Sequence, residues 1–252
     1  MRKFAACLAG RSTPLLGDRA KHNADPVTMN IASLDGTRIT FDLVGTGQPI
    51  LLLHGFSHDR TIWTRTGWVE RLRSEFRVVA LDLRGCGESD KPSAADAYSL
   101  EAHIADIDAV LLELHIERPM VWGWSFGATL ALHLAKNTMV ARTVAAGTYF
   151  GPIFTSAYVE ARLSEATGAL QRARWSGLES WSAVAPSEVR GPLLVYTGTR
   201  DGNVVRELQR QRASIETAGG HLHVLEGLNH IELLTATRPV AALVEPFIRA
   251  VA

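Results

Sequence analysis

Short, continuous apolar runs recur along the chain, and each one predicts a strand buried on both faces of a sheet. Stretches with apolar residues at helical spacing lie between several of these runs. Strands that alternate with helices predict an α/β fold with a mainly parallel central sheet flanked by helices. The runs are 49–53, 78–81, 120–122, 144–146, 193–196 and 222–225.

Three helical stretches are clearest. Ser99 is a suitable N-cap for a helix whose apolar residues follow at helical spacing as far as position 114. Residues 129–136 are rich in Ala and Leu and predict a second helix. Residues 239–250 predict a C-terminal helix with proline at its start.

The first 28 residues show no such period, and the pattern changes at Met29. Residues 29–34 and 37–43 read as two strands around Asp35-Gly36, which is a strong hairpin signal. We therefore interpret residues 1–28 as a peripheral N-terminal extension and residues 29–252 as the body of the fold. The apolar run 4–9 is shorter than a signal-peptide core, and no run reaches the ~18 apolar residues of a spanning helix. We expect no membrane association.

Composition excludes some function classes. Hydrophobic residues make up 46% of the chain and charged residues 21%, as in ordinary globular proteins. Lys+Arg and Asp+Glu both total 26, so the formal net charge of zero argues against a nucleic-acid partner. The two cysteines, Cys7 and Cys86, have no metal-ligand spacing and form no disulfide framework, which favours a cytoplasmic location. We interpret Cys86 as a passive small residue in a turn.

The strongest chemical signal is Gly123-Trp124-Ser125-Phe126-Gly127, which matches G-x-S-x-G. The pentapeptide alone is a weak signal, but here it follows a predicted strand and precedes a helical stretch. In that context the glycines permit a sharp turn that projects the serine from the top of the sheet. The free N–H groups and dipole of the following helix favour negative charge on the reacting oxygen. Ser125 is therefore the candidate nucleophile.

A serine hydroxyl needs a base to remove its proton, and the base needs a carboxylate to orient it. In this architecture these groups follow the order serine, acid, histidine along the chain. Asp201 follows the strand 193–196, and His230 follows the strand 222–225. Both positions lie at the carboxyl ends of strands, where α/β sheets place functional groups. Asp201 and His230 are the candidate acid and base.

Other interpretations compete with these two. Asp201 precedes a glycine and is also suited to be a plain turn former. Glu207 is a rival acid, on what is predicted to be a solvated helix face. His221 and His223 rival His230, but they lie within or at the edge of a strand, where histidine is more often a surface or packing residue.

Acyl transfer also requires donors for an oxyanion, and the loss of one such donor typically costs ~2.7–4 kcal/mol. We expect the backbone N–H of Phe126, directly after the nucleophile, to be one donor. The loop after the strand 49–53 should supply the other, and we choose the N–H of Phe56. His54 in the same loop precedes the turn, so we interpret it as a tie between loops and not as the base.

Five motifs together resemble the α/β-hydrolase superfamily over about residues 29–252. They are His54-Gly55-Phe56, Asp82-Leu83-Arg84-Gly85-Cys86-Gly87-Glu88-Ser89, the pentapeptide 123–127, Gly198-Thr199-Arg200-Asp201 and Gly227-Leu228-Asn229-His230. The resemblance implies the α/β-hydrolase fold, a triad of Ser125, His230 and Asp201, and an oxyanion hole at Phe56 and Phe126. It also implies that Arg84 pins neighbouring loops. Because the nucleophile is serine and not aspartate, the family's dehalogenase and epoxide hydrolase activities are not expected.

Members of this family usually carry a helical cap before the strand that leads to the acid. Here the corresponding interval, about 149–191, is short for the family and predicts two or three short helices with an apolar underside. Most of its aromatic residues are expected to fasten the cap to the body. One or two of them, with Phe56, Phe126, Phe150 and Phe154, are candidates to line an acyl or alcohol pocket.

The sequence thus predicts a serine hydrolase of the carboxylesterase type, acting on small to medium apolar esters through an acyl-enzyme. It requires neither a metal nor an organic cofactor, and its partner is a small-molecule ester or lactone. Lactone opening, carbon–carbon bond hydrolysis and perhydrolysis use the same triad and stay open. A non-catalytic ligand-binding protein on the same fold is the alternative from another class, although no triad residue is missing.

Overall fold

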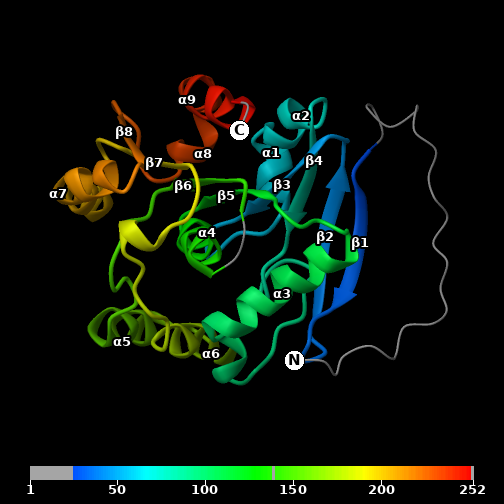
Figure 1. Cartoon of the computed structure of the whole chain (residues 1–252). Coiled ribbons are helices and arrows are strands. Elements are labelled where there is room, and N and C mark those ends of the chain that lie inside the picture. The colour runs from blue at the N-terminus through cyan, green and yellow to red at the C-terminus, as the bar shows by residue number, and fades with distance from the viewer. Residues whose placement is uncertain (1–24, 138–139, 251–252) are drawn as a thin grey trace, which may run out of the picture.

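The computed structural model describes residues 25–137 and 140–250, which form an eight-stranded sheet in the order β1-β2-β4-β3-β5-β6-β7-β8 (Figure 1). β2 pairs antiparallel with β1 and β4, and all pairs among β3 to β8 are parallel. The predicted α/β fold with a mainly parallel sheet is confirmed. The strands are β1 (Val27–Ala32), β2 (Arg38–Val44), β3 (Gln48–Leu53), β4 (Phe76–Leu81), β5 (Met120–Trp124), β6 (Arg142–Ala146), β7 (Leu193–Gly198) and β8 (His221–Leu225).

Helices cover both faces of the sheet, which explains why the central strands are continuously apolar. In β3, Ile50 and Leu52 belong to the core cluster completed by α1, α2, α8 and α9, whereas Leu51 and Leu53 belong to the cluster completed by α3 and α4. A third cluster joins α4 and α7. The helices are α1 (Thr61–Arg65), α2 (Trp68–Leu72), α3 (Leu100–Glu113), α4 (Phe126–Asn137), α5 (Ser156–Glu165), α6 (Ala169–Leu178), α7 (Gly202–Thr217), α8 (Glu232–Thr235) and α9 (Thr237–Arg249).

The predicted elements are present with small shifts. Ser99 caps α3 by accepting the N–H of Ala102, as expected. β1 begins at Val27, two residues before the expected strand, so the body of the fold starts slightly earlier than Met29. Most of the proposed extension, residues 1–24 with Cys7, lies outside the described residues.

The short cap is also confirmed. Between β6 and β7 the chain forms α5, α6 and a 3-10 turn, Pro186–Glu188. Figure 1 shows α5 and α6 side by side, away from the layer of α1, α2, α8 and α9. The underside of the cap contributes Leu178 and Trp181 to the core cluster around α3 and α4, so this part of the cap is packed on the body.

Two charged clusters fix the loops around the carboxyl end of β4. Arg84 is fully buried and donates two hydrogen bonds to Asp106, at 2.7 and 2.6 Å, and others to Asp35 and the Ala97 carbonyl. The expected role of Arg84 as a pin between loops is therefore seen directly. These contacts span residues 35 to 106, so they tie the hairpin, the turn after β4 and α3 together.

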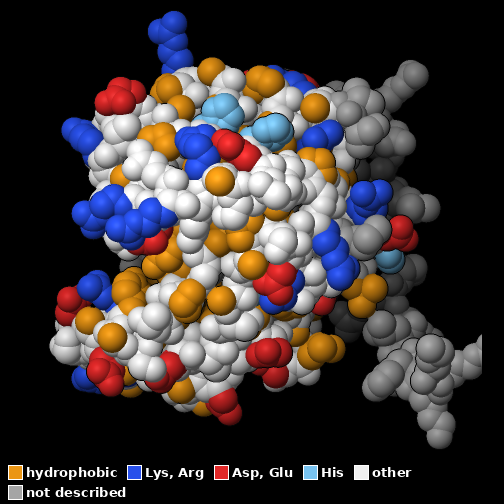
Figure 2. Space-filling model, turned by 60° about the vertical axis from the view of Figure 1, so that its left-hand side comes forward, with side chains coloured by type: hydrophobic (Ala, Val, Ile, Leu, Met, Phe, Trp, Pro, Cys, Tyr) orange, Lys and Arg blue, Asp and Glu red, His pale blue; other side chains and the backbone are white. Residues whose placement is uncertain are grey.

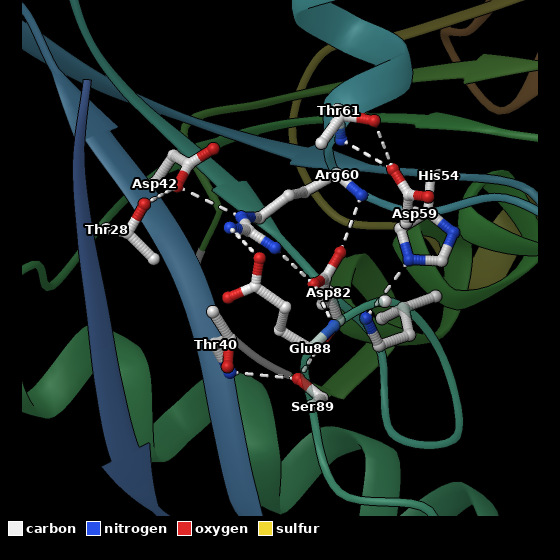
Figure 3. Close-up of polar contacts among 12 residues, drawn as sticks. Thr28, Thr40, Asp42, His54, Asp59, Arg60, Thr61, Asp82, Glu88 and Ser89 are labelled. Carbon is white, nitrogen blue, oxygen red and sulfur yellow. Dashed lines mark hydrogen bonds and ion pairs between the residues drawn. The ribbon is translucent and has the colours of Figure 1, made fainter. Parts of the chain in front are cut away.

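The second cluster surrounds Arg60, which lies between Asp42 and Asp82 (Figure 3). The buried carboxylate of Asp82 accepts the backbone N–H and the guanidinium of Arg60 and the backbone N–H of Glu88. Its backbone carbonyl accepts the hydroxyl of Ser89 at 2.7 Å. One carboxylate thus holds both the start of α1 and the turn 82–89.

Three histidines are buried within the described residues, and burial lowers the pKa of each. The pKa of His54 falls to about 4, that of His103 to about 3 and that of His133 to about 4. A histidine in the unfolded chain has a pKa of about 6.5, so unfolding takes up protons below that pH. Stability is therefore full above about pH 6.5 and is lost as the pH falls toward 4.

We predict that the free energy of unfolding falls by about 3–4 kcal/mol between pH 7 and pH 5.5, or about 1.2 kcal/mol per buried histidine. Urea unfolding at the two pH values measures this loss. His103→Gln should retain about two thirds of it, whereas the exposed His221→Gln should retain all of it. Equal stability at both pH values would contradict the prediction.

Among the helices within residues 25–137 and 140–250, none combines the length and the apolar character that a membrane span requires.

Candidate active site

Ser125 lies at a sharp turn between β5 and α4, and it has a φ of 57°. A non-glycine residue rarely adopts this left-handed conformation, and such strain is concentrated at functional sites. The backbone N–H of Ser125 donates to the Ala146 carbonyl of β6, at 2.8 Å, which holds the turn against the sheet. The serine is thus fixed at the carboxyl edge of the sheet, as its motif predicted.

The two motif glycines act through close packing and not through their own backbone angles. Neither Gly123 nor Gly127 is among the described residues with positive φ. A Cβ on Gly123 would lie 2.1 Å from the Gly127 carbonyl oxygen, and one on Gly127 would lie 2.2 Å from that of Leu53. The positive φ of the turn belongs to Ser125 and not to the glycines. The glycines permit the turn because no side chain fits at their positions.

The structure brings Ser125, His230 and Asp201 together from three different loops. His230 Nε2 lies 2.9 Å from Ser125 Oγ, and His230 Nδ1 lies 2.8 Å from Asp201 Oδ1. In this arrangement the carboxylate can orient the imidazole, and the imidazole faces the hydroxyl. The histidine side chain is 41% exposed, whereas that of the aspartate is 4% exposed.

The contacts of Asp201 favour one of the two interpretations of this residue. It occupies the N-cap position of α7, yet its side chain makes no capping hydrogen bond. One carboxylate oxygen faces His230, and the other accepts the hydroxyl of Thr197 at 2.8 Å. A turn former would bond to its own backbone, so this carboxylate is aimed at the histidine.

The competing residues lie elsewhere. His221 and His223 are exposed on β8, and Glu207 pairs with Arg210 on α7. His54 is fully buried, with Nδ1 2.8 Å from the Gly55 carbonyl oxygen, while Nε2 accepts the backbone N–H of Leu83. His54 therefore ties two loops together, as expected.

Sequence reasoning missed the residues that hold His230. The indole N–H of Trp124 donates to the His230 carbonyl at 2.9 Å, across 106 residues of sequence. Gly147 lies so close that a Cβ there would be 2.9 Å from Cε1 of the imidazole. Trp124 occupies a variable position of the motif, and Gly147 directly follows β6, so only their places in the fold indicate these roles.

An open cleft of about 780 Å³ adjoins the histidine and the aspartate. Trp124, Val204 and Ile231 give it apolar walls, and His58 stands in it with its ring 4.9 Å from that of Trp124. Burial lowers the pKa of His58, which favours its neutral form. The remaining lining residues are Arg200, Gly202, Asn203 and Asn229.

The two expected oxyanion donors, the backbone N–H groups of Phe56 and Phe126, belong to segments that both adjoin Ser125. Phe126 is the first residue of α4, so its backbone N–H has no partner within the helix. Gly55, next to Phe56, is packed so closely that a Cβ there would lie 3.3 Å from Cβ of Ser125. The Phe56 and Phe126 rings meet edge to face at 5.6 Å, so the two donor segments are in contact.

Aromatic rings of the cap continue from this pair. Trp175 stacks on Phe56, and Phe154 contacts Phe126. Tyr158 lies against both Trp175 and Phe154. The five aromatic side chains, those of Phe56, Phe126, Phe154, Tyr158 and Trp175, therefore form a continuous cluster in which each contacts two others. Figure 2 shows hydrophobic side chains gathered in the hollow between the cap, in the lower part of the view, and the rest of the molecule.

Within the described residues, no group of three or more His, Cys, Asp or Glu side chains is arranged to hold a metal ion.

Cys86 is buried, and burial raises the pKa of its thiol to about 11. A thiol in that state is a poor nucleophile, which agrees with its interpretation as a passive residue.

Residues 48–238 match the family model described as alpha/beta hydrolase fold. A curated relative from Mycobacterium bovis is 36% identical over 117 residues, which are 46% of this chain and 33% of the relative. Epoxide hydrolase 4 from Mus musculus is 35% identical over 138 residues, covering 50% of this chain and 38% of that protein. The chain therefore spans only about a third of the length of such relatives.

Solved structures agree on the fold. An esterase from Exiguobacterium antarcticum superposes with a TM-score of 0.76 at 20% identity, over 89% of this chain and 100% of that chain. The enol-lactonase from Burkholderia xenovorans gives a TM-score of 0.69 at 19% identity, over 88% and 100% of the two chains. At such low identity these similarities concern the fold alone.

Proposed function

The chain belongs to the α/β-hydrolase family, and we propose that it is a serine hydrolase that cleaves carboxylic esters through an acyl-enzyme on Ser125. The observation that carries the proposal is the continuous hydrogen-bonded arrangement of Ser125, His230 and Asp201. It supplies a nucleophile, a base and an orienting carboxylate in the required order.

In the proposed mechanism, Ser125 Oγ attacks the ester carbonyl carbon while His230 Nε2 takes the hydroxyl proton. The backbone N–H groups of Phe56 and Phe126 stabilise the resulting oxyanion. His230 then donates its proton to the alcohol oxygen as the carbon–oxygen bond breaks. A water molecule, deprotonated by His230, then attacks the acyl-enzyme. As the bond between the acyl carbon and Ser125 Oγ breaks, His230 returns its proton to Oγ and the carboxylic acid is released, while Asp201 accepts Nδ1–H throughout.

The nucleophile favours esters over epoxides, although the relatives from Mus musculus and Homo sapiens both carry the name epoxide hydrolase 4. Attack by Ser125 on an ester gives an acyl ester of the serine, which an activated water can hydrolyse. Attack on an epoxide carbon would give an alkyl ether of the serine, which has no carbonyl for water to attack. A serine at this position therefore turns over acyl substrates and would be blocked by epoxides.

The side chains around Ser125 and His230 support a small to medium, apolar substrate. The five aromatic rings beside the two oxyanion donors favour an apolar acyl group, and the apolar walls of the open cleft favour an apolar alcohol group. No cofactor takes part in the proposed steps, and the proposed partner is the small-molecule ester itself. The low cysteine content supports a cytoplasmic location.

We predict that p-nitrophenyl esters of increasing acyl length are hydrolysed with a clear optimum at one length, because the proposed acyl site beside Phe56 and Phe126 is bounded by aromatic rings of the cap. The rate of p-nitrophenol release, with the Ser125→Ala protein as the blank, measures it. If every ester fails while Ser125 still reacts with a fluorophosphonate, the ester proposal is wrong. Lactones and carbon–carbon bonds would then be the next substrates to examine.

A further inference from the structure

Arg174, on the cap helix α6, reaches across to the loop that contains Phe56. Its Nη2 donates to the backbone carbonyl of Phe56 at 2.5 Å and lies 3.1 Å from the sulfur of Cys86. Its guanidinium carbon also lies 3.9 Å from the centroid of the Phe56 ring. One cap residue thus contacts both the backbone and the side chain of an expected oxyanion donor, across 118 residues of sequence.

The next residue of the cap strengthens this contact. Trp175 stacks on the Phe56 ring with a centroid distance of 3.9 Å and an interplanar angle of 22°. The methylene stem of Arg174 packs on the turn after β4, where a Cβ on Gly85 would lie 3.0 Å from its Cδ. The arginine is therefore held between the turn and the donor loop, in contact with both.

We propose that Arg174 is a positioning residue that sets the Phe56 peptide for oxyanion binding, so that the docked cap is part of the catalytic apparatus. The proposal rests on the serine-hydrolase function given above. The N–H and the carbonyl of Phe56 flank one Cα, so fixing the carbonyl and the ring restricts the backbone angles that aim the N–H. A preorganised donor stabilises an oxyanion far better than one that must reorient during the reaction.

A positioning role for Arg174 and a purely structural role predict different effects on kcat and KM. A residue that only fastens the cap would change stability, or substrate binding through KM. A residue that aims an oxyanion donor changes an interaction made chiefly in the transition state, so kcat falls and KM stays nearly constant. The binding of a tetrahedral transition-state analogue should weaken in the same proportion as kcat/KM.

The test compares Arg174→Met with Arg172→Met, which removes the same charge from an exposed position on the same helix. We expect Arg174→Met to lower kcat about 10- to 100-fold, less than complete loss of a donor, and to change KM less than about threefold. Affinity for a boronic acid that adds to Ser125 should fall by the same factor as kcat/KM. Arg174→Lys should recover part of the loss, and Arg172→Met should match the wild type in every measurement.

Several results would overturn the proposal. Unchanged kcat in folded Arg174→Met protein is one, and a raised KM at unchanged kcat is another. Far-UV circular dichroism establishes that each variant is folded, and Arg174→Lys provides the comparison if the methionine variant is not.

A second readout separates this proposal from the ester function. Phosphonylation of Ser125 by a fluorophosphonate needs the same oxyanion donors but no ester substrate. Slower labelling of Arg174→Met than of Arg172→Met supports the role of Arg174 even if no ester is hydrolysed. Equal labelling of the two variants overturns the role of Arg174 and leaves the nucleophile intact. A wild-type protein that is not labelled overturns the proposed function and this inference with it.

Discussion

Replacing His230 with alanine is expected to lower kcat for ester hydrolysis by about 10⁶-fold, because Ser125 then has no base within reach. In the structure, Nε2 of His230 lies 2.9 Å from the serine oxygen. The same nitrogen must protonate the leaving alcohol and activate water, so its removal affects both halves of the reaction. Single-turnover and steady-state rates on the best p-nitrophenyl ester measure the loss.

Asp201→Ala should be less severe, with a loss of about 10⁴-fold, since the carboxylate acts through the imidazole. The double variant should be no slower than His230→Ala alone, because the two residues act as a unit. His221→Ala, which removes an exposed histidine from β8, is the matched control and should keep the wild-type rate. A His230→Ala enzyme within tenfold of the wild type would contradict the assignment.

The largest effect on stability is expected from Asp82→Ala, which should lower the free energy of unfolding by about 3–5 kcal/mol. Its carboxylate is fully buried and accepts two backbone N–H groups and the guanidinium of Arg60 (Figure 3). Removing it leaves buried donors without a partner and a buried cation with less compensation. Urea denaturation at neutral pH measures the change.

Asp90→Ala provides the control from the same loop. Asp90 also pairs with an arginine, Arg38, but the two side chains are 45% and 50% exposed. Exposed pairs of this kind contribute little, so Asp90→Ala should cost no more than about 1 kcal/mol. Equal losses for the two variants would show that burial does not decide the strength of these contacts.

Much of the fold could be predicted because the central strands contain continuous apolar runs, such as 50–53 and 193–196, and such runs are typical of a sheet covered on both faces. Two helices that the sequence did not predict are short. Helices α1 and α2 have five residues each, too few to show a helical period. Their tryptophans, Trp63 and Trp68, instead lie edge-on against Trp122 of β5, a contact that depends on the fold.

Only those residues of the candidate site that belong to a short sequence motif, or that directly follow a predicted strand, could be predicted from the sequence. Ser125 lies within a recognisable pentapeptide, and Asp201 and His230 follow successive strands. The contacts that support them join residues far apart in sequence: Trp124 to the His230 carbonyl, and Arg174 to the Phe56 carbonyl. In both cases the acceptor is a backbone carbonyl, which every residue possesses, so no sequence pattern could identify the pairing.

The central claim, that Ser125 is a nucleophile activated by His230, is tested most directly by fluorophosphonate labelling followed by peptide mass spectrometry. We predict one adduct per chain on Ser125, no adduct in Ser125→Ala, and much slower labelling in His230→Ala. An unlabelled wild-type protein, or an adduct on another residue that persists in Ser125→Ala, would contradict the account.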